Sequence, residues 1–574
     1  MKKLLVYLKY YKKETILAPL FKMLEASFEL FVPLVIAGMI DKGIGGESKS
    51  YIGWMGGVLV LLGIIGLICS VTAQYFSAKA ATGFASRLRK VLFSHIQKLS
   101  FTQLDEAGSA TLITRMTSDV NQVQSGVNLV LRLFLRSPFI VFGAMIMAFT
   151  VDVKGALVFV VTIPLLSVVV FGIMLISIPL YKKVQLCLDG VLFKTRENLT
   201  GIRVIRAFNK EEEEKQDFYE KNDALNKVQV FVGRFSALMN PVTYLIVNGA
   251  IFYLIWTGAL QVEAGKLTQG EVVALVNYMS QILVELVKLA NLIITVTKAI
   301  ACGNRIEEVL DLPVEKETVR NDFKEEYAGC VVFEKVTFSY HKDAQPAIKD
   351  ISFTAKKGET IGIIGGTGAG KSTIVNMLPA FYVPTSGNIY IDGKNVTSYD
   401  KKQLTDKIGM VMQKAVLFKG SIADNLKFGK EDATEEEMWK ALSMAQAKEF
   451  VEQKEGGLSF VIQEGGKNLS GGQRQRMTIA RALIKQPEIL VLDDSASALD
   501  YATDAALRKA LKETGEKQIT FIVSQRAASI MHADQIIVLD EGEMAGIGKH
   551  SELLNTCRVY KEIYDSQFKK EAAV

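Results

Sequence analysis

The sequence predicts two parts of different fold class. The first is an α-helical membrane domain with six transmembrane helices extended into the cytoplasm, and the second is an α/β domain. The 574-residue chain is 49% hydrophobic although 22% of its residues are charged. Its long apolar runs lie in the first half, whereas the second half alternates β-rich and helical patterns. We therefore place a membrane domain at residues 1–302, a charged linker at 303–329 and an α/β domain at 330–574.

Charge and cysteine usage exclude several other classes. The net charge of +6 is too small and too dispersed to indicate a nucleic-acid-binding protein. The five cysteines form no C-x-x-C pair, so neither a disulfide framework nor a zinc site is predicted. The first apolar run is long and flanked by charges, which argues against a cleavable signal peptide.

The apolar runs predict six membrane spans. They are Ile16–Ile40, Tyr51–Ala78, Val127–Thr150, Ala156–Leu180, Phe231–Leu260 and Val272–Thr297. A basic, amphipathic lead-in at Met1–Glu14 is interpreted as a helix lying along the inner membrane surface. Lysine and arginine cluster at the N-terminus and in alternate connections, so the positive-inside rule places both termini in the cytoplasm.

Two connections between spans, Lys79–Gly126 and Tyr181–Val230, are too long for turns and keep a helical pattern. We interpret them as spanning helices that continue into the cytoplasm. Their turning points are Phe101–Ser109 and Phe208–Phe218. These tips are either solvated helix ends or segments that dock on a nucleotide-binding domain and transmit its motion.

Charged residues also occur within the spans, where lipid would penalise them. Lys22, Glu25 and Glu29 must therefore face the helix bundle or water. Glu285 and Lys288 are three residues apart and share a helix face, so they are either functional or a local ion pair. Arg132 and Arg136 lie near the start of the third span, and we expect them to reach a membrane surface.

The strongest motif is GGTGAGKST, which fits G-x-x-x-x-G-K-[ST] between a β-rich run and a helical pattern. Its glycines allow backbone N–H groups to surround phosphate oxygens, its lysine reaches the β- and γ-phosphates, and its serine can bind Mg²⁺. The motif predicts that the chain binds a nucleoside triphosphate. Its residues are Gly365, Gly366, Thr367, Gly368, Ala369, Gly370, Lys371, Ser372 and Thr373.

Three further residues are candidates for the same site. Tyr340 follows a strand-like run and either stacks on adenine or packs against the sheet. Gln413 follows another strand and either completes the Mg²⁺ shell or is a surface glutamine. Asp493 ends the apolar strand ILVLD, which is typical of a buried strand that delivers a carboxylate to Mg²⁺.

The sequence LSGGQ begins a second helix with the potential to bind phosphate. Its residues Ser470, Gly471, Gly472 and Gln473 either form this site or an ordinary N-cap, and the local pattern favours the N-cap. One chain has little use for two phosphate sites on one nucleotide. In a head-to-tail dimer, however, the second would cover the γ-phosphate bound by the partner.

Together these motifs resemble those of ABC exporter half-transporters, over essentially the whole chain. The resemblance rests on six spans followed by GGTGAGKST, Gln413, LSGGQ, VLDD and SALD. It implies that Tyr340 stacks on adenine, that Gln413 and Asp493 serve Mg²⁺, and that Ser470–Gln473 contacts the partner's ATP. It also implies that Ser497–Asp500 lies along the dimer seam and that the two cytoplasmic tips contain or flank coupling helices.

Two positions depart from the family pattern. Where the family has a glutamate acting as general base, this chain has Asp494, whose carboxylate is set back by about 1.5 Å, one C–C bond. Where the family has a histidine at the γ-phosphate, this chain has Gln525, which cannot titrate. His532 lies further along, and we do not expect it to substitute. The lysine-containing site should bind ATP and hydrolyse it slowly.

The sequence therefore predicts an ATP-driven exporter of the cell membrane that works as a heterodimer with a second half-transporter, with Mg²⁺ and ATP as cofactors. The substrate is a lipophilic small molecule, a lipid or a peptide. Alternatives are a homodimeric exporter with slow hydrolysis, and an ATP-gated channel or regulatory protein on the same scaffold.

Overall fold

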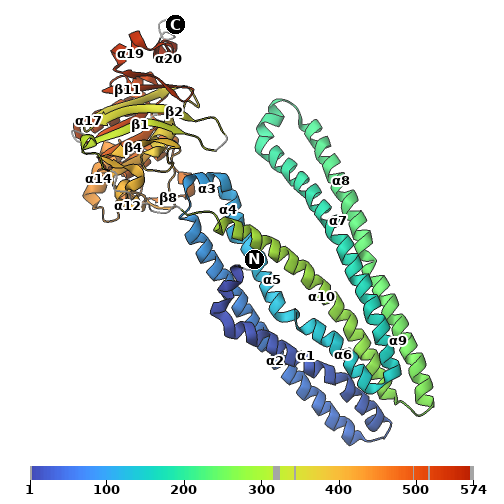
Figure 1. Cartoon of the computed structure of the whole chain (residues 1–574). Coiled ribbons are helices and arrows are strands. Elements are labelled where there is room, and N and C mark those ends of the chain that lie inside the picture. The colour runs from blue at the N-terminus through green and yellow to red at the C-terminus, as the bar shows by residue number, and fades with distance from the viewer. Residues whose placement is uncertain (1–2, 315–322, 342–343, 496, 515–517, 569–574) are drawn as a thin grey trace. The chain divides into compact units, whose positions relative to one another are not determined.

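The computed structural model describes the chain except for residues 1–2, 315–322, 342–343, 496, 515–517 and 569–574 (Figure 1). It forms two compact units. The membrane unit comprises Met1–Gln97 and Ala107–Leu312, and the α/β unit comprises Lys98–Glu106 and Pro313–Val574. The α/β unit thus includes a short piece of chain that lies between two helices of the membrane unit in sequence.

The membrane unit is helical throughout its described elements. They are η1 (Leu4–Tyr11), α1 (Lys12–Gly38), η2 (Met39–Ile44), α2 (Lys49–Ile96), α4 (Ser109–Thr114), η3 (Arg115–Asp119), α5 (Val120–Leu133), α6 (Arg136–Val151), α7 (Val153–Ala207), α8 (Glu211–Ala237), α9 (Met239–Glu263) and α10 (Gln269–Leu310). Within the described residues, six helical stretches are long and apolar enough to cross a membrane, which confirms the six predicted spans.

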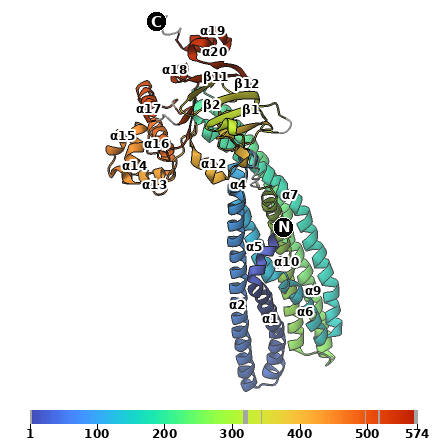
Figure 2. The ribbon, with the colours of Figure 1, turned by 60° about the vertical axis from the view of Figure 1, so that its left-hand side comes forward.

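Several of these helices are much longer than a bilayer requires. A span needs about 20 residues, whereas α2 has 48 and α7 has 55. The predicted continuation of the spanning helices is therefore confirmed. Figure 2 shows α1 and α2 running side by side. Fully buried Ala18, Ala26 and Ala73 belong to these two helices, and such small side chains allow close approach of neighbouring helices.

The third span is broken between α5 and α6, at Phe134 and Leu135. Pro138 explains the break, because proline has no N–H to donate to the carbonyl four residues earlier and its ring clashes there. The break places Arg136 at the start of α6. We expected Arg136 to reach a membrane surface, and this is wrong: its side chain is 8% exposed and forms 2.7 Å ion pairs with Glu285 and Glu29.

Three other charges of the spans, Lys22, Glu25 and Lys288, are also paired. Lys22 is buried and contacts Glu25 at 2.5 Å, which agrees with the expectation that these side chains face the bundle. Lys288 donates to Glu285 at 2.8 Å, so the predicted local ion pair exists. Beyond the membrane spans, α10 continues past Gly303 to Leu310 because Ile306 and Val309 are buried, so the helix extends into the segment predicted as linker.

The α/β unit contains two main sheets. Its strands are β1 (Cys330–Phe338), β2 (Ile348–Lys356), β3 (Thr360–Gly365), β4 (Ser386–Ile391), β5 (Lys394–Asn395), β6 (Ile408–Val411), β7 (Gly420–Ser421), β8 (Val461–Ile462), β9 (Ile489–Asp493), β10 (Ile519–Val523), β11 (Gln535–Asp540) and β12 (Glu543–Gly548). The larger sheet has the order β12-β11-β3-β10-β9-β6, and only the edge strand β12 is antiparallel. The second sheet, β2-β1-β4-β5, is antiparallel.

Helices cover and connect these sheets. They are α3 (Phe101–Ala107), α11 (Lys371–Met377), α12 (Lys401–Lys407), α13 (Ile422–Lys427), α14 (Glu435–Met444), α15 (Lys448–Glu452), α16 (Gly471–Leu483), α17 (Tyr501–Thr514), α18 (Ala527–Ile530), α19 (His550–Thr556) and α20 (Arg558–Phe568), with 3-10 turns η4 (Glu325–Tyr327), η5 (Val396–Ser398), η6 (Gly457–Ser459) and η7 (Glu464–Gly466). The strands β3, β9 and β10 are buried on both faces, as expected for central parallel strands.

A buried ion pair in the membrane unit provides a test of its packing. Asp119 is 3% exposed and accepts hydrogen bonds from Arg305 Nε and Arg115 Nη1, each at 3.0 Å. We expect Asp119→Ala to destabilise the unit by about 1–3 kcal/mol, because it leaves two cations without their anion. Thermal unfolding of the purified chain measures this. The matched control is Lys215→Ala, which removes an exposed pair with Glu212 and should change the midpoint little. Equal effects of the two variants would contradict the prediction.

Candidate nucleotide-binding site

The phosphate loop connects β3 to α11, which confirms the strand and helix predicted around it. Gly370 has φ of 90°, and a Cβ there would lie 2.5 Å from Ile348 Cγ2. Only glycine is compatible with both this backbone conformation and this close approach. Lys371 is 9% exposed, and its Nζ donates to the carbonyls of Gly365 and Gly366 at 3.0 and 2.6 Å. The lysine ammonium is thus held over the loop that would surround a phosphate.

Four strands deliver the remaining candidates to the same edge of the sheet. Because β3, β10, β9 and β6 are adjacent and parallel, their carboxyl ends meet there, which is where ligands bind in open α/β sheets. A cavity of about 310 Å³ lies at this edge. Its lining includes Tyr340, Thr367–Thr373, Gln413, Asp493, Asp494 and Gln525. The structure therefore brings these sequence-predicted residues together.

Asp493 ends β9 as predicted and is 4% exposed. Ser372 Oγ donates to its Oδ1 at 3.0 Å. Burial raises the pKa of the Asp493 carboxyl, and the neighbouring Asp494 adds to this. A buried carboxylate beside a hydroxyl and the amide of Gln413 is an all-oxygen donor set, which suits Mg²⁺ bound together with phosphates. These residues fit the predicted metal, which would neutralise charge on the phosphates when bound.

Asp494 adopts a left-handed conformation with φ of 45°, and its N–H donates to Val523 O at 3.0 Å. This bond ties the residue to the end of β10. Burial raises the pKa of the Asp494 carboxyl, while a hydrogen bond from Gln413 and the charge of Lys371 act in the opposite direction. Gln525 follows β10 and also lines the cavity. Both departures from the family pattern thus lie at the phosphate end of the site.

His532 lies elsewhere in the unit. Helix α18 runs back from Gln525, and the neighbouring Asp534 N–H donates to Thr360 O at the amino end of β3, opposite the phosphate loop. Burial lowers the pKa of His550, and the neighbouring His532 adds to this, so His532 lies near His550. This agrees with the expectation that His532 does not replace the missing histidine.

Tyr340 lies beside the phosphate loop, with its hydroxyl 3.0 Å from Thr373 Oγ1. Its ring packs edge-on against two other rings, with centroids 4.9 Å from that of Phe338 and 5.2 Å from that of Tyr382. The ring is therefore packed against the sheet side of the cavity while 37% of the residue stays exposed. Packing and adenine stacking are compatible here, because one face of the ring can pack while another receives the base.

Most of the first predicted tip, residues 101–106, belongs to the α/β unit. Phe101 of α3 packs on Phe381 with ring centroids 4.3 Å apart, and Asp105 accepts a 2.6 Å hydrogen bond from Tyr382. His341, next to Tyr340, lies 3.6 Å from Glu106. Tyr382 thus contacts both α3 and Tyr340. Sequence reasoning missed Tyr382, because nothing in its surroundings indicates a contact with a segment 277 residues away.

The LSGGQ residues are outside this cavity. Ser470 Oγ accepts from Gln473 N–H at 3.2 Å, and Gln473 Oε1 accepts from Ser470 N–H at 3.0 Å, which forms a capping box at the start of α16. The N-cap interpretation is therefore confirmed locally. Ser470 and Gly471 are exposed, so a partner's phosphate can still reach this helix end. Asp500 similarly caps α17 through the Thr503 N–H at 2.8 Å.

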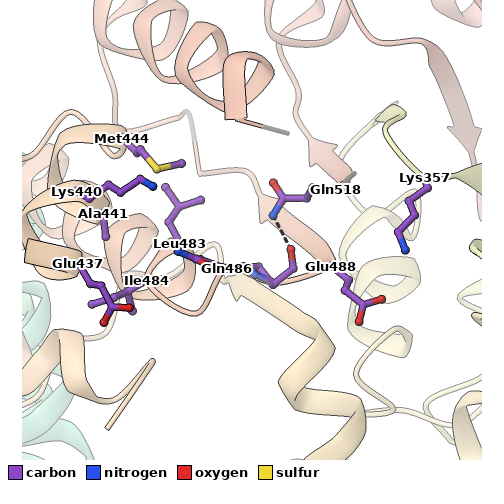
Figure 3. Close-up of a pocket in the computed structure, with 11 residues that line it drawn as sticks. Lys357, Glu437, Lys440, Ala441, Met444, Leu483, Ile484, Gln486, Glu488 and Gln518 are labelled. Carbon is purple, nitrogen blue, oxygen red and sulfur yellow. Dashed lines mark hydrogen bonds between the residues drawn. The ribbon is translucent and has the colours of Figure 1, made fainter. Parts of the chain in front are cut away.

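A larger cavity of about 580 Å³ lies between α14, the end of α16 and the starts of β9 and β10 (Figure 3). There Gln518 Nε2 donates to Pro487 O at 2.7 Å. Glu488 and Gln518 precede β9 and β10, so this cavity is at the amino ends of the strands. It is therefore distinct from the phosphate site at the carboxyl ends.

Comparison with known proteins decides the family. The model of the ABC transporter transmembrane region matches residues 15–286, and the ABC transporter model matches residues 348–497. The uncharacterized ABC transporter ATP-binding protein YfiB of Bacillus subtilis is 36% identical over 573 residues and covers 100% of both chains. The chain belongs to the ABC transporter family. It joins one transmembrane region to one ATPase domain, as ABC half-transporters do.

Other relatives of this ABC transporter carry functional names. The putative multidrug export ATP-binding/permease protein YgaD of Bacillus subtilis is 32% identical, with 99% of each chain covered. The ATP-dependent lipid A-core flippase of Hahella chejuensis is 30% identical and covers 90% of this chain and 88% of its own. A solved bacterial Atm1-family ABC exporter with ATP bound has a TM-score of 0.79 over 97% of this chain and 98% of its own, at 22% identity, and therefore shows the fold alone.

The ABC transporter is thus a multi-pass membrane protein with an ATP-hydrolysing transporter domain. ABC ATPase domains bind ATP, typically with Mg²⁺. ABC half-transporters function as dimers.

The raised pKa of Asp493 gives a stability prediction. A group with a raised pKa binds its proton more tightly in the folded state, so ionised Asp493 lowers stability at neutral pH. This penalty disappears as pH falls through the folded pKa. Asp493→Asn should therefore raise the thermal midpoint of nucleotide-free protein at pH 7.5 by about 2–4 °C, the shift that about 1 kcal/mol produces, with a smaller gain at pH 5.

Thermal scans with and without Mg²⁺ and ATP measure this effect. Mg²⁺ and ATP should stabilise the native protein more than the variant, because only the carboxylate offers the metal a charge. A lower midpoint for the nucleotide-free variant at pH 7.5 would contradict the prediction.

Proposed function

We propose that this ABC transporter is one half of an ATP-driven exporter that moves a lipophilic small molecule, a lipid or a peptide across the cell membrane. The names of YgaD and the lipid A-core flippase support export of multidrug or lipid type. In this proposal both termini and the α/β unit are cytoplasmic. ATP binding closes two α/β units, the membrane units open outward, and hydrolysis resets the pair.

We further propose a heterodimer in which the Lys371 site is the slow one. One observation carries this: Asp494 and Gln525 line the cavity of Lys371, whereas Ser470–Gln473 lies outside it and matches the family pattern. A shorter carboxylate is displaced from an attacking water, and loss of a general base costs roughly 10²–10⁴ in rate. The intact LSGGQ would complete a competent site on a partner with glutamate and histidine at these positions.

Within the site, each side chain has a proposed task. Tyr340 stacks on adenine, Gly365–Thr373 surrounds the phosphates, and Lys371 contacts the β- and γ-phosphates. Ser372, Gln413 and Asp493 hold Mg²⁺. Contacts of α3 with Phe381 and Tyr382 support the proposal that the first tip transmits closure of the α/β units to the membrane helices.

The heterodimer is tested by measuring ATPase activity of the purified chain alone and with a second half-transporter that carries glutamate and histidine at the two positions. Slow turnover alone and a rise of at least tenfold for the pair are expected. Brisk turnover by the chain alone would overturn the heterodimer and favour a homodimeric exporter.

The two departures are tested directly by the double substitution Asp494→Glu and Gln525→His. Introducing the longer carboxylate and a titratable side chain should raise the rate of hydrolysis at this site by roughly 10- to 100-fold. This is at the lower end of the rate enhancement that a general base provides. Single-turnover hydrolysis of radiolabelled ATP measures it. Asp494→Asn is the control and should not increase the rate. An unchanged rate in the double variant would show that other features limit hydrolysis.

The same scaffold supports a channel or regulatory protein as a second candidate, favoured by the same Asp494 and Gln525. Substrate accumulation against a gradient in proteoliposomes supports the exporter. Dissipative conductance would support the channel.

A further inference from the structure

The membrane unit contains a cavity of about 300 Å³ between α1, α6 and α10. Its polar lining consists of Glu29, Asn277, Ser280, Gln281, Glu285 and Lys288, and apolar side chains of α1, α6 and α10 complete its walls. This volume is at the lower end of ligand pockets and suits a polar head with a few methylene groups. Charged side chains are rare inside a membrane span.

A chain of ion pairs forms the charged wall of the cavity. Arg136 donates to Glu285 and to Glu29, each at 2.7 Å, and Lys288 donates to Glu285 at 2.8 Å. Ser137 Oγ donates to the second oxygen of Glu285 at 2.8 Å. The central pair is buried, since the side chains of Arg136 and Glu285 are 8% and 4% exposed. The side chains at the two ends of this ion-pair network are more exposed: that of Glu29 is 40% exposed and that of Lys288 is 42% exposed.

The position along α10 places these charges within the membrane. Glu285 lies about 24 Å from the start of α10 at Gln269, at a rise of 1.5 Å per residue, and the hydrocarbon core is about 30 Å thick. Ionisable groups at such depth are costly, and they mark binding sites or pathways more often than packing. Gln281 Oε1 is buried without a hydrogen-bond partner among the described residues, so one lining atom has an unused acceptor.

The sum of the charges selects the kind of ligand. Two carboxylates and two cations make the network neutral. A ligand with a net charge would bring an uncompensated charge into a cavity within the membrane, which is unfavourable. A zwitterion adds no net charge, and it finds a carboxylate at one end of the network and an ammonium at the other.

We propose that this cavity binds the zwitterionic head of a single-chain amphiphile, with the cationic group of the ligand at Glu29 and its anionic group at Lys288. The apolar walls receive the first methylene groups of its chain. The proposal rests on the proposed export function, for which it names the substrate class. Arg136 and Glu285 act as positioning residues that hold the two ends apart.

The test uses the full chain in phosphatidylglycerol nanodiscs and tritiated hexadecylphosphocholine with a photoreactive diazirine in its chain. After illumination, peptides of α1 and α10 should carry the label. Unlabelled hexadecylphosphocholine should compete at a concentration at least tenfold lower than hexadecyltrimethylammonium or hexadecyl sulfate, which share the tail but carry a net charge. Equal competition by all three would overturn the proposal, and so would preference for either charged competitor.

Variants of Glu29 and Lys288, the two ends of the ion-pair network, complete the test. Glu29→Gln and Lys288→Gln should each reduce labelling at least fivefold, whereas Lys298→Gln, an exposed lysine further along α10, should leave it unchanged. Retained ATP binding verifies folding of each variant. Unchanged labelling in both end variants would overturn the proposal.

Nanodiscs of phosphatidylcholine identify the source of the ligand. Loss of labelling there means that bulk membrane lipid occupies the cavity, and persistence means that single-chain amphiphiles do. Labelling requires neither hydrolysis nor transport. Normal labelling without transport would therefore contradict the export function alone, whereas normal ATPase activity without labelling would contradict the site alone.

Discussion

A site for a triphosphate requires cationic and hydrogen-bonding groups at one place in the α/β unit. The parallel order β3-β10-β9-β6 meets this requirement, because it places the carboxyl ends of four strands at one edge of the sheet. Lys371 contributes a positive charge, the loop glycines contribute backbone N–H groups, and Asp493 contributes the carboxylate for Mg²⁺. Burial raises the pKa of the Asp493 carboxyl, so ionised Asp493 opposes folding while no cation is bound beside it.

In the proposed heterodimer, the same sheet edge accounts for a site that binds ATP but hydrolyses it slowly. Asp494 is fixed by its bond to Val523 at the end of β10, so a shorter side chain has little freedom to advance toward the γ-phosphate. Binding depends on the loop and Lys371, which the departures leave intact. A chain with complete binding residues and altered catalytic residues is therefore suited to hold a nucleotide and to complete a partner's site with Ser470–Gln473.

The membrane unit follows a different constraint, because a buried charge within a span is costly without a partner. Lys22 meets Glu25, and Arg136 joins Glu29 to Glu285. The break at Pro138 makes the second arrangement possible by starting α6 at Arg136. Here a break in the helix and a buried ion-pair network occur together beside a cavity with polar lining.

Sequence alone determined the features that depend on local pattern. Apolar runs long enough to cross a bilayer identified the six spans, and glycine spacing with Lys371 and Ser372 identified the phosphate loop, because each pattern serves one physical requirement over a short stretch. Tertiary structure alone decided which distant residues meet. Tyr382 on Asp105 and Arg136 between Glu29 and Glu285 join segments more than a hundred residues apart. No local pattern encodes such pairs, since they result from how helices and strands pack and not from the preference of any one of them.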